Sequence, residues 1–108
     1  MSRRGAELIP RHVIDDVNEM LRPLNPNAAD SLLRYVADEL TSMFRELSEE
    51  RSADEGKARL VLSRKEERLF EKLNELLPGE QSLIEELFKV LRPVFEQHFE
   101  NQRGRKYL

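Results

Sequence analysis

Few side chains in this sequence have the type and spacing that acid–base or metal chemistry needs. His12 precedes Asp15 and Asp16 by three and four residues, a spacing that places all three on one face of a helix. An imidazole and carboxylates are zinc ligands, so this group offers half of a metal site. The second histidine, His98, alternates with two glutamates and shares no helical face with them. We therefore expect no metal and no cofactor.

Paired acids are the other candidates for catalysis. Glu66-Glu67 and Glu85-Glu86 fall on solvated faces of the expected helices, where nothing tunes a carboxyl for proton transfer. The sequence has no glycine-rich phosphate loop and no nucleophile motif. We predict that the chain is not an enzyme.

Composition favours one helical domain. The 108 residues are 39% apolar and 36% charged, and only four are glycine. The absence of cysteine excludes disulfides and thiolate metal sites. No apolar run approaches the roughly 18–20 residues that span a bilayer, and the N-terminus lacks the apolar core of a signal peptide. We expect a protein without membrane contact that is cytoplasmic, or nuclear if the host is a eukaryote.

The longest amphipathic stretch runs from Asn25 to Leu47, and the other segments are expected to pack on it. Asn25 can accept a hydrogen bond from a free N–H at the helix start, and Pro26 suits the first turn. Charged residues of this stretch, Glu39 included, are assigned to the solvated face. The apolar residues recur at steps of three and four and form one stripe: Ala29, Leu32, Leu33, Val36, Leu40, Met43, Phe44 and Leu47.

Three further stretches have the same helical spacing. In residues 10–24 Pro10 opens the predicted helix and Pro23 closes it, whereas 63–77 and 82–99 each begin with the Ser-x-x-Glu spacing of a capping box. Pro93 lies inside the last stretch and predicts a kink near Leu91 or a short fifth helix. The predicted fold is therefore all-α: a small bundle of four helices, or five, with short corners.

The chain divides into three parts on this basis. Residues 1–9 are expected to be a flexible basic arm, 10–102 a single helical domain, and 103–108 a basic tail. A polar, charged segment at about 48–59 predicts a flexible loop inside the domain.

Charge is distributed unevenly along the chain. Residues 1–11 and 101–108 carry six basic groups and one acidic group, whereas the rest carries 12 basic and 20 acidic groups. An acidic body repels a phosphate backbone, but basic ends can reach one. Arg103, Arg105 and Lys106 are therefore the candidate nucleic-acid contacts, although nucleic acid is not the favoured partner.

The favoured function is a non-catalytic interaction or assembly module, such as an adaptor. The apolar stripes of 25–47 and 82–99 are long relative to the other two, so some apolar surface is left for a second copy or another protein. The alternative is a monomer whose helices close fully on one another. Aromatic and methionine side chains dominate interface anchors, and the predicted anchors are Met43, Phe44, Phe88, Phe95 and Phe99.

The order of elements over residues 10–77 is similar to that of a histone fold. A short helix, a corner, a long helix, a loop, the apolar run Leu60-Val61-Leu62 and a capped helix follow one another. The resemblance implies a dimer, and it implies that Arg59 in the second loop pairs with Glu66. DNA contacts would then come from loop residues such as Arg22, Lys57 and Arg59. The loop at 48–59 and the large helix after residue 77 depart from that pattern.

The C-terminal residues Gly104-Arg105-Lys106-Tyr107-Leu108 look like the docking tail of proteasome activators. In that family the terminal carboxylate and a penultimate tyrosine enter pockets on the protease ring. The resemblance implies that Tyr107 and Leu108 would be the contacts. Lys106 departs from it, because an apolar residue is usual before the tyrosine.

Overall fold

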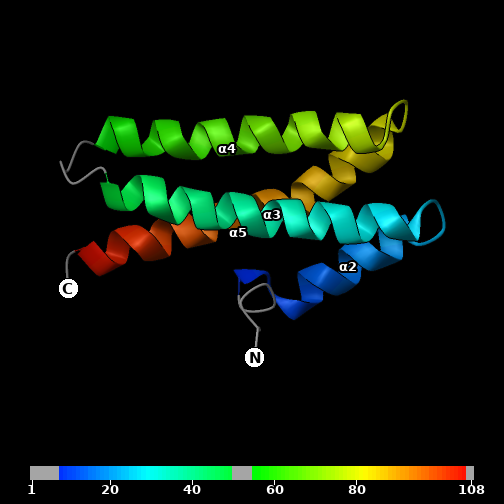
Figure 1. Cartoon of the computed structure of the whole chain (residues 1–108), viewed down its shortest axis with the longest axis horizontal. Coiled ribbons are helices and arrows are strands. Elements are labelled where there is room, and N and C mark those ends of the chain that lie inside the picture. The colour runs from blue at the N-terminus through cyan, green and yellow to red at the C-terminus, as the bar shows by residue number, and fades with distance from the viewer. Residues whose placement is uncertain (1–7, 50–54, 107–108) are drawn as a thin grey trace.

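The computed structural model describes residues 8–49 and 55–106, with side chains as far as residue 102. Its four helices are α2 (Arg11–Leu21), α3 (Pro26–Glu49), α4 (Glu55–Leu76) and α5 (Gln81–Lys106). α3 and α4 lie side by side, α2 packs along the other side of α3, and α5 crosses obliquely behind α3 (Figure 1). α5 contacts all three other helices. The predicted all-α four-helix bundle is confirmed.

The central helix begins as the sequence predicts. Asn27 donates its backbone N–H to Oδ1 of Asn25 over 3.0 Å, and Pro26 is the first residue of α3. Leu32, Val36, Leu40 and Met43 of the predicted stripe are all fully buried. α2 and α4 cover this stripe from its two sides and α5 covers it from behind.

The polar loop predicted at 48–59 is much shorter than expected. α3 continues to Glu49 and α4 begins at Glu55, which leaves only 50–54 outside the described residues. Glu, Lys, Arg and Ala are good helix formers whether or not they are buried, and Glu55 pairs with Arg59 one turn later over 3.5 Å. The run 60–62 is therefore helical, and Ser63 lies inside α4 rather than capping it.

The arm predicted at 1–9 is also shorter than expected. Ile9 is 2% exposed and belongs to the core, and the Leu8 carbonyl accepts a hydrogen bond from Nε2 of His98 on α5. The ring of Phe44 packs edge to face against His98, with the centroids 5.3 Å apart. Two apolar residues next to a helix start are buried readily. Residues 1–7 lie outside the described residues.

α5 runs without interruption from Gln81 to Lys106, through Pro93. The described chain therefore has no separate fifth helix. Leu91 before the proline and Val94 and Phe95 after it are all buried in one core, so packing on both sides outweighs the lost backbone hydrogen bond. The helix begins one residue before Ser82, the predicted cap.

The turn between α4 and α5 sets the two helices beside each other. Gly79 has φ = +83°, a conformation that a residue with a Cβ rarely adopts. The Glu80 N–H donates to the Leu77 carbonyl over 3.1 Å and closes the turn. The turn at Pro78-Gly79 places α5 next to α4 at the groove described below.

Candidate functional site

Three of the five predicted interface anchors lie in the core of the bundle. Met43 and Phe95 are 0% exposed and Phe99 is 1% exposed. Phe44 and Phe88 are half-buried at the edge of the core. Each long stripe is covered by three neighbouring helices, so Met43, Phe95 and Phe99 are not accessible to a partner in this structure.

The chain ends give no site among the described residues. The backbone of Arg103, Arg105 and Lys106 belongs to the last turns of α5, but their side chains lie outside the described residues, as do Tyr107 and Leu108 entirely. Both the nucleic-acid contacts and the docking tail stay predictions.

The ion pair implied by the histone resemblance is wrong. Arg59 and Glu66 lie on the same helix, α4, and no described loop separates them. Arg59 pairs instead with Glu55, and Glu66 lies 3.5 Å from Nε of Arg92 on α5. The short apolar run between them is helical because α4 is one continuous helix of 22 residues.

His12, Asp15 and Asp16 are all exposed on α2. Among residues 8–49 and 55–106, no group of three or more histidines, cysteines or acids is placed to hold a metal ion. None of the four described helices contains an apolar stretch sufficient to cross a membrane.

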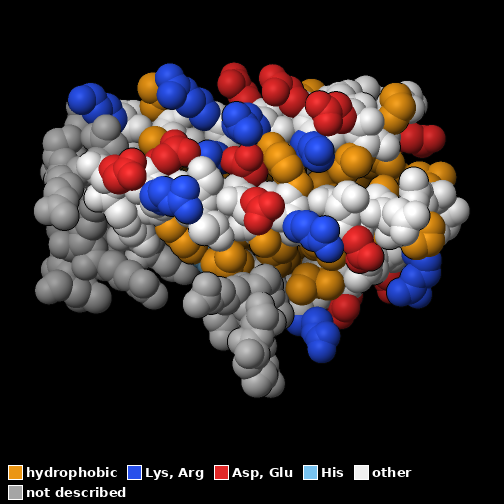
Figure 2. Space-filling model, viewed as in Figure 1, with side chains coloured by type: hydrophobic (Ala, Val, Ile, Leu, Met, Phe, Trp, Pro, Cys, Tyr) orange, Lys and Arg blue, Asp and Glu red, His pale blue; other side chains and the backbone are white. Residues whose placement is uncertain are grey.

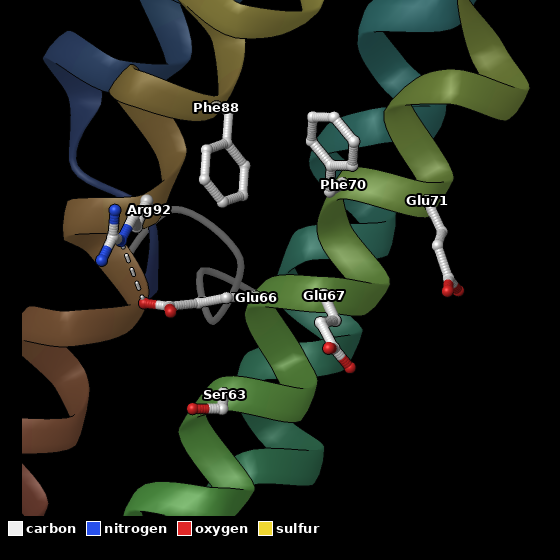
Figure 3. Close-up of a pocket in the computed structure, with 7 residues that line it drawn as sticks. All are labelled: Ser63, Glu66, Glu67, Phe70, Glu71, Phe88 and Arg92. Atoms are coloured by element: carbon white, nitrogen blue, oxygen red, sulfur yellow. Dashed lines mark ion pairs between the residues drawn. The ribbon is translucent and has the colours of Figure 1, made fainter.

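A groove of about 550 Å³ lies between α4 and α5. Phe70 and Glu66 point from α4 toward α5, where Phe88 and Arg92 face them, while Glu71 points away (Figure 3). The lining is Ser63, Glu66, Glu67, Phe70, Glu71, Phe88 and Arg92. We call it the α4–α5 groove.

One end of the groove is aromatic. Phe70 is 38% exposed, and its ring packs edge to face against that of Phe88, with the centroids 5.7 Å apart and the planes at 81°. This is a favoured arrangement of two rings. The pair stays open to solvent and therefore offers an apolar contact surface.

The middle of the groove is charged. Nε of Arg92 donates to Oε2 of Glu96 over 2.9 Å and lies 3.5 Å from Oε2 of Glu66. The Glu66 side chain is 16% exposed, and its Oε2 is buried without a hydrogen bond of good geometry. The Arg92 guanidinium thus forms ion pairs with two carboxylates, and Nε makes its shorter contact, a hydrogen bond, with Glu96.

Comparison with protein-family models, curated protein sequences and solved structures finds no match for this chain.

Burial raises the pKa of Glu66, which was predicted to be solvated. The adjacent carboxyl of Glu96, which can share a proton with it, raises the pKa further, and Arg92 lowers it. Because the pKa is raised, the folded state binds the proton of Glu66 more tightly than the unfolded chain does. Protonated Glu66 therefore contributes to the free energy of unfolding. This contribution is complete below the ordinary pKa of 4.5 and is lost as the pH rises through the folded-state pKa.

We expect Glu66→Gln to show this linkage directly. Glutamine cannot ionise, so the variant does not lose this contribution. The free energy of unfolding of the variant should therefore increase relative to that of the native chain as the pH rises above 4.5. Urea unfolding at several pH values measures the difference. Glu67→Gln, at the neighbouring exposed position, is the control and should give no such trend. A pH-independent difference for Glu66→Gln would contradict the account.

Sequence reasoning also did not predict an ion cluster between α3 and α4, in which Lys65 and Glu39 are buried. Lys65 is 6% exposed and Glu39 is 8% exposed. Nζ of Lys65 lies 2.7 Å from Oε2 of Glu46, 3.1 Å from Oγ of Ser42 and 3.2 Å from Oε1 of Glu39. Nη2 of Arg68 lies 3.3 Å from the other oxygen of Glu39. We call these five residues the Lys65 cluster.

The Lys65 cluster joins two helices and faces no groove described above. A signal for it was present, because Glu39 follows Val36 by three residues and precedes Met43 by four, which places it on the buried stripe. Lys65 has the same relation to Leu62 and Leu69. Its contacts link Lys65 and Arg68 of α4 to Glu39, Ser42 and Glu46 of α3.

Proposed function

We propose that this protein is a non-catalytic protein–protein interaction module that docks an amphipathic helix in the α4–α5 groove. The Phe70–Phe88 pair supports the proposal most strongly. It is an aromatic surface in a concave site, the setting in which an apolar anchor of a partner is best desolvated. A groove between two helices suits a third helix presenting apolar residues along one face.

Charge favours another protein over a second copy as the occupant. The groove is lined by three glutamates and one arginine. A twofold pairing of two such grooves would bring like charges together, which is unfavourable. A basic amphipathic helix complements the same surface. The face that Figure 2 shows, over α3 and α4, carries acidic and basic side chains interspersed.

The proposal is tested by selecting helical peptides from a displayed library on the intact chain, and then measuring their affinity for variants. We expect Phe70→Ser to weaken the selected peptides at least about tenfold, as loss of an interface anchor does. Leu60→Ser is the matched control, because Leu60 is 50% exposed on the same helix but does not line the groove. Equal effects of the two substitutions would contradict the proposal.

The self-association predicted from the sequence stays a prediction, and the mass in solution tests it. A mass of 12.7 kDa in light scattering at two protein concentrations would support an external partner. A dimer that Phe70→Ser dissociates would instead make a second copy the occupant of the groove. A dimer that Phe70→Ser leaves intact would place self-association elsewhere on the molecule.

A further inference from the structure

We propose that the helix docked in the α4–α5 groove carries a lysine or arginine one turn from its apolar anchor, and that Glu66 receives this cation. The inference rests on the proposed docking function and names the chemistry of the partner. It follows from the order in which the groove presents its side chains and from the state of the Glu66 carboxylate.

The groove is built in two layers. On α4, Glu66 lies four residues before Phe70, and on α5, Arg92 lies four residues after Phe88. Residues four apart on a helix are neighbours one turn apart. Phe70 therefore faces Phe88 in one layer, and Glu66 faces Arg92 in the next (Figure 3).

A helix lying along this groove meets both layers with side chains that are also one turn apart. An apolar residue placed at the Phe70–Phe88 pair brings the residue three or four positions away to the Glu66 layer. The spacing of the two layers in the groove therefore matches the spacing of side chains on the docked helix. A single turn of that helix supplies both contacts.

The carboxylate of Glu66 selects a cation for the second contact. Its Oε2 is buried and lacks a hydrogen bond, because Nε of Arg92 donates to Glu96 instead. The ion pair with Nε of Arg92 at 3.5 Å leaves this buried acceptor without a hydrogen bond, which is costly, and hydrogen bonds to charged groups are the stronger ones. The Arg92 side chain is 54% exposed and already donates to Glu96, so it can keep that bond, move away from Glu66 and leave Glu66 to the incoming cation.

The test is a double-mutant cycle with a peptide from the selection described above. We compare the peptide with its Lys→Gln or Arg→Gln form on the native chain and on Glu66→Gln. We expect the charged peptide to bind the native chain about tenfold more tightly than any of the other three pairs, a coupling within the range for close charge pairs. Glu71→Gln is the control, because Glu71 lines the groove but points away from α5 (Figure 3).

The outcomes separate this inference from the proposed function. If the charged and uncharged peptides differ equally on the native chain and on Glu66→Gln, or if the selected peptides carry no basic residue, the inference is overturned while Phe70-dependent docking stands. If Phe70→Ser leaves binding unchanged, both the proposed docking function and the inference about Glu66 are contradicted. An unchanged affinity of the uncharged peptide for Glu66→Gln shows that the variant keeps a folded groove.

Discussion

Phe95→Ala is expected to lower the free energy of unfolding by about 3–5 kcal/mol, the range for removing a fully buried aromatic side chain. Phe95 is 0% exposed and follows Pro93 in the middle of α5. The α2, α3 and α4 helices surround α5, and they cannot close over the lost ring without moving against one another. The cavity therefore adds to the lost hydrophobic transfer.

The matched comparison is Phe70→Ala, which removes the same side chain from a position 38% exposed in the groove. We expect it to cost about 1 kcal/mol or less while it weakens docking. Urea unfolding of both variants measures the contrast. A cost of about 1 kcal/mol or less for Phe95→Ala as well would contradict the burial of Phe95 in the bundle and make it a candidate interface residue again.

Lys65→Met is expected to cost about 2–4 kcal/mol, because it leaves the buried carboxylate of Glu39 without its closest cation. Arg68 still contacts the other oxygen of Glu39, which holds the effect at the lower end of what breaking a buried pair costs. The methionine keeps the length of the side chain, so the loss is of charge rather than of packing. Urea unfolding measures it.

Two further variants test whether the unpaired charge of Glu39 causes the loss of stability in Lys65→Met. Glu39→Gln combined with Lys65→Met removes both buried charges and should recover part of the loss, whereas Lys89→Met at an exposed position of α5 should cost less than about 0.5 kcal/mol. In Lys65→Met the pKa of Glu46, which the hydrogen bond from Lys65 holds below 4.5 in the native chain, should rise toward that value. A double variant no better than the single one would contradict the account.

The helices were predictable from the sequence because apolar spacing and caps act locally. The start of α3 at Asn25 and Pro26 and the turn at Gly79 follow from the chemistry of those residues alone. The charged segment before Leu60 has no apolar face, so apolar spacing predicts a loop there. Its side chains still favour a helix, and apolar periodicity does not detect an exposed helical end.

The site was less predictable because it depends on which faces of separate helices meet. Sequence spacing identifies Phe88, Phe95 and Phe99 as one aromatic set, but only the crossing of α5 over three helices buries two of them and leaves Phe88 at an edge. Glu66 was assigned to solvent because its partner, Arg92, is 26 residues away on α5. The residues next to Glu66 in the sequence do not indicate a contact with a residue on another helix.

The most direct test of the docking account is a chemical-shift map of the native chain. Peptides selected on this chain, with no counter-selection, are titrated against it while the backbone amide signals are followed by NMR. The account predicts that the perturbed amides cluster at 63–71 of α4 and 88–96 of α5, on the two walls of the groove. Perturbations confined to α2 and to the face of α3 away from α5 would contradict it.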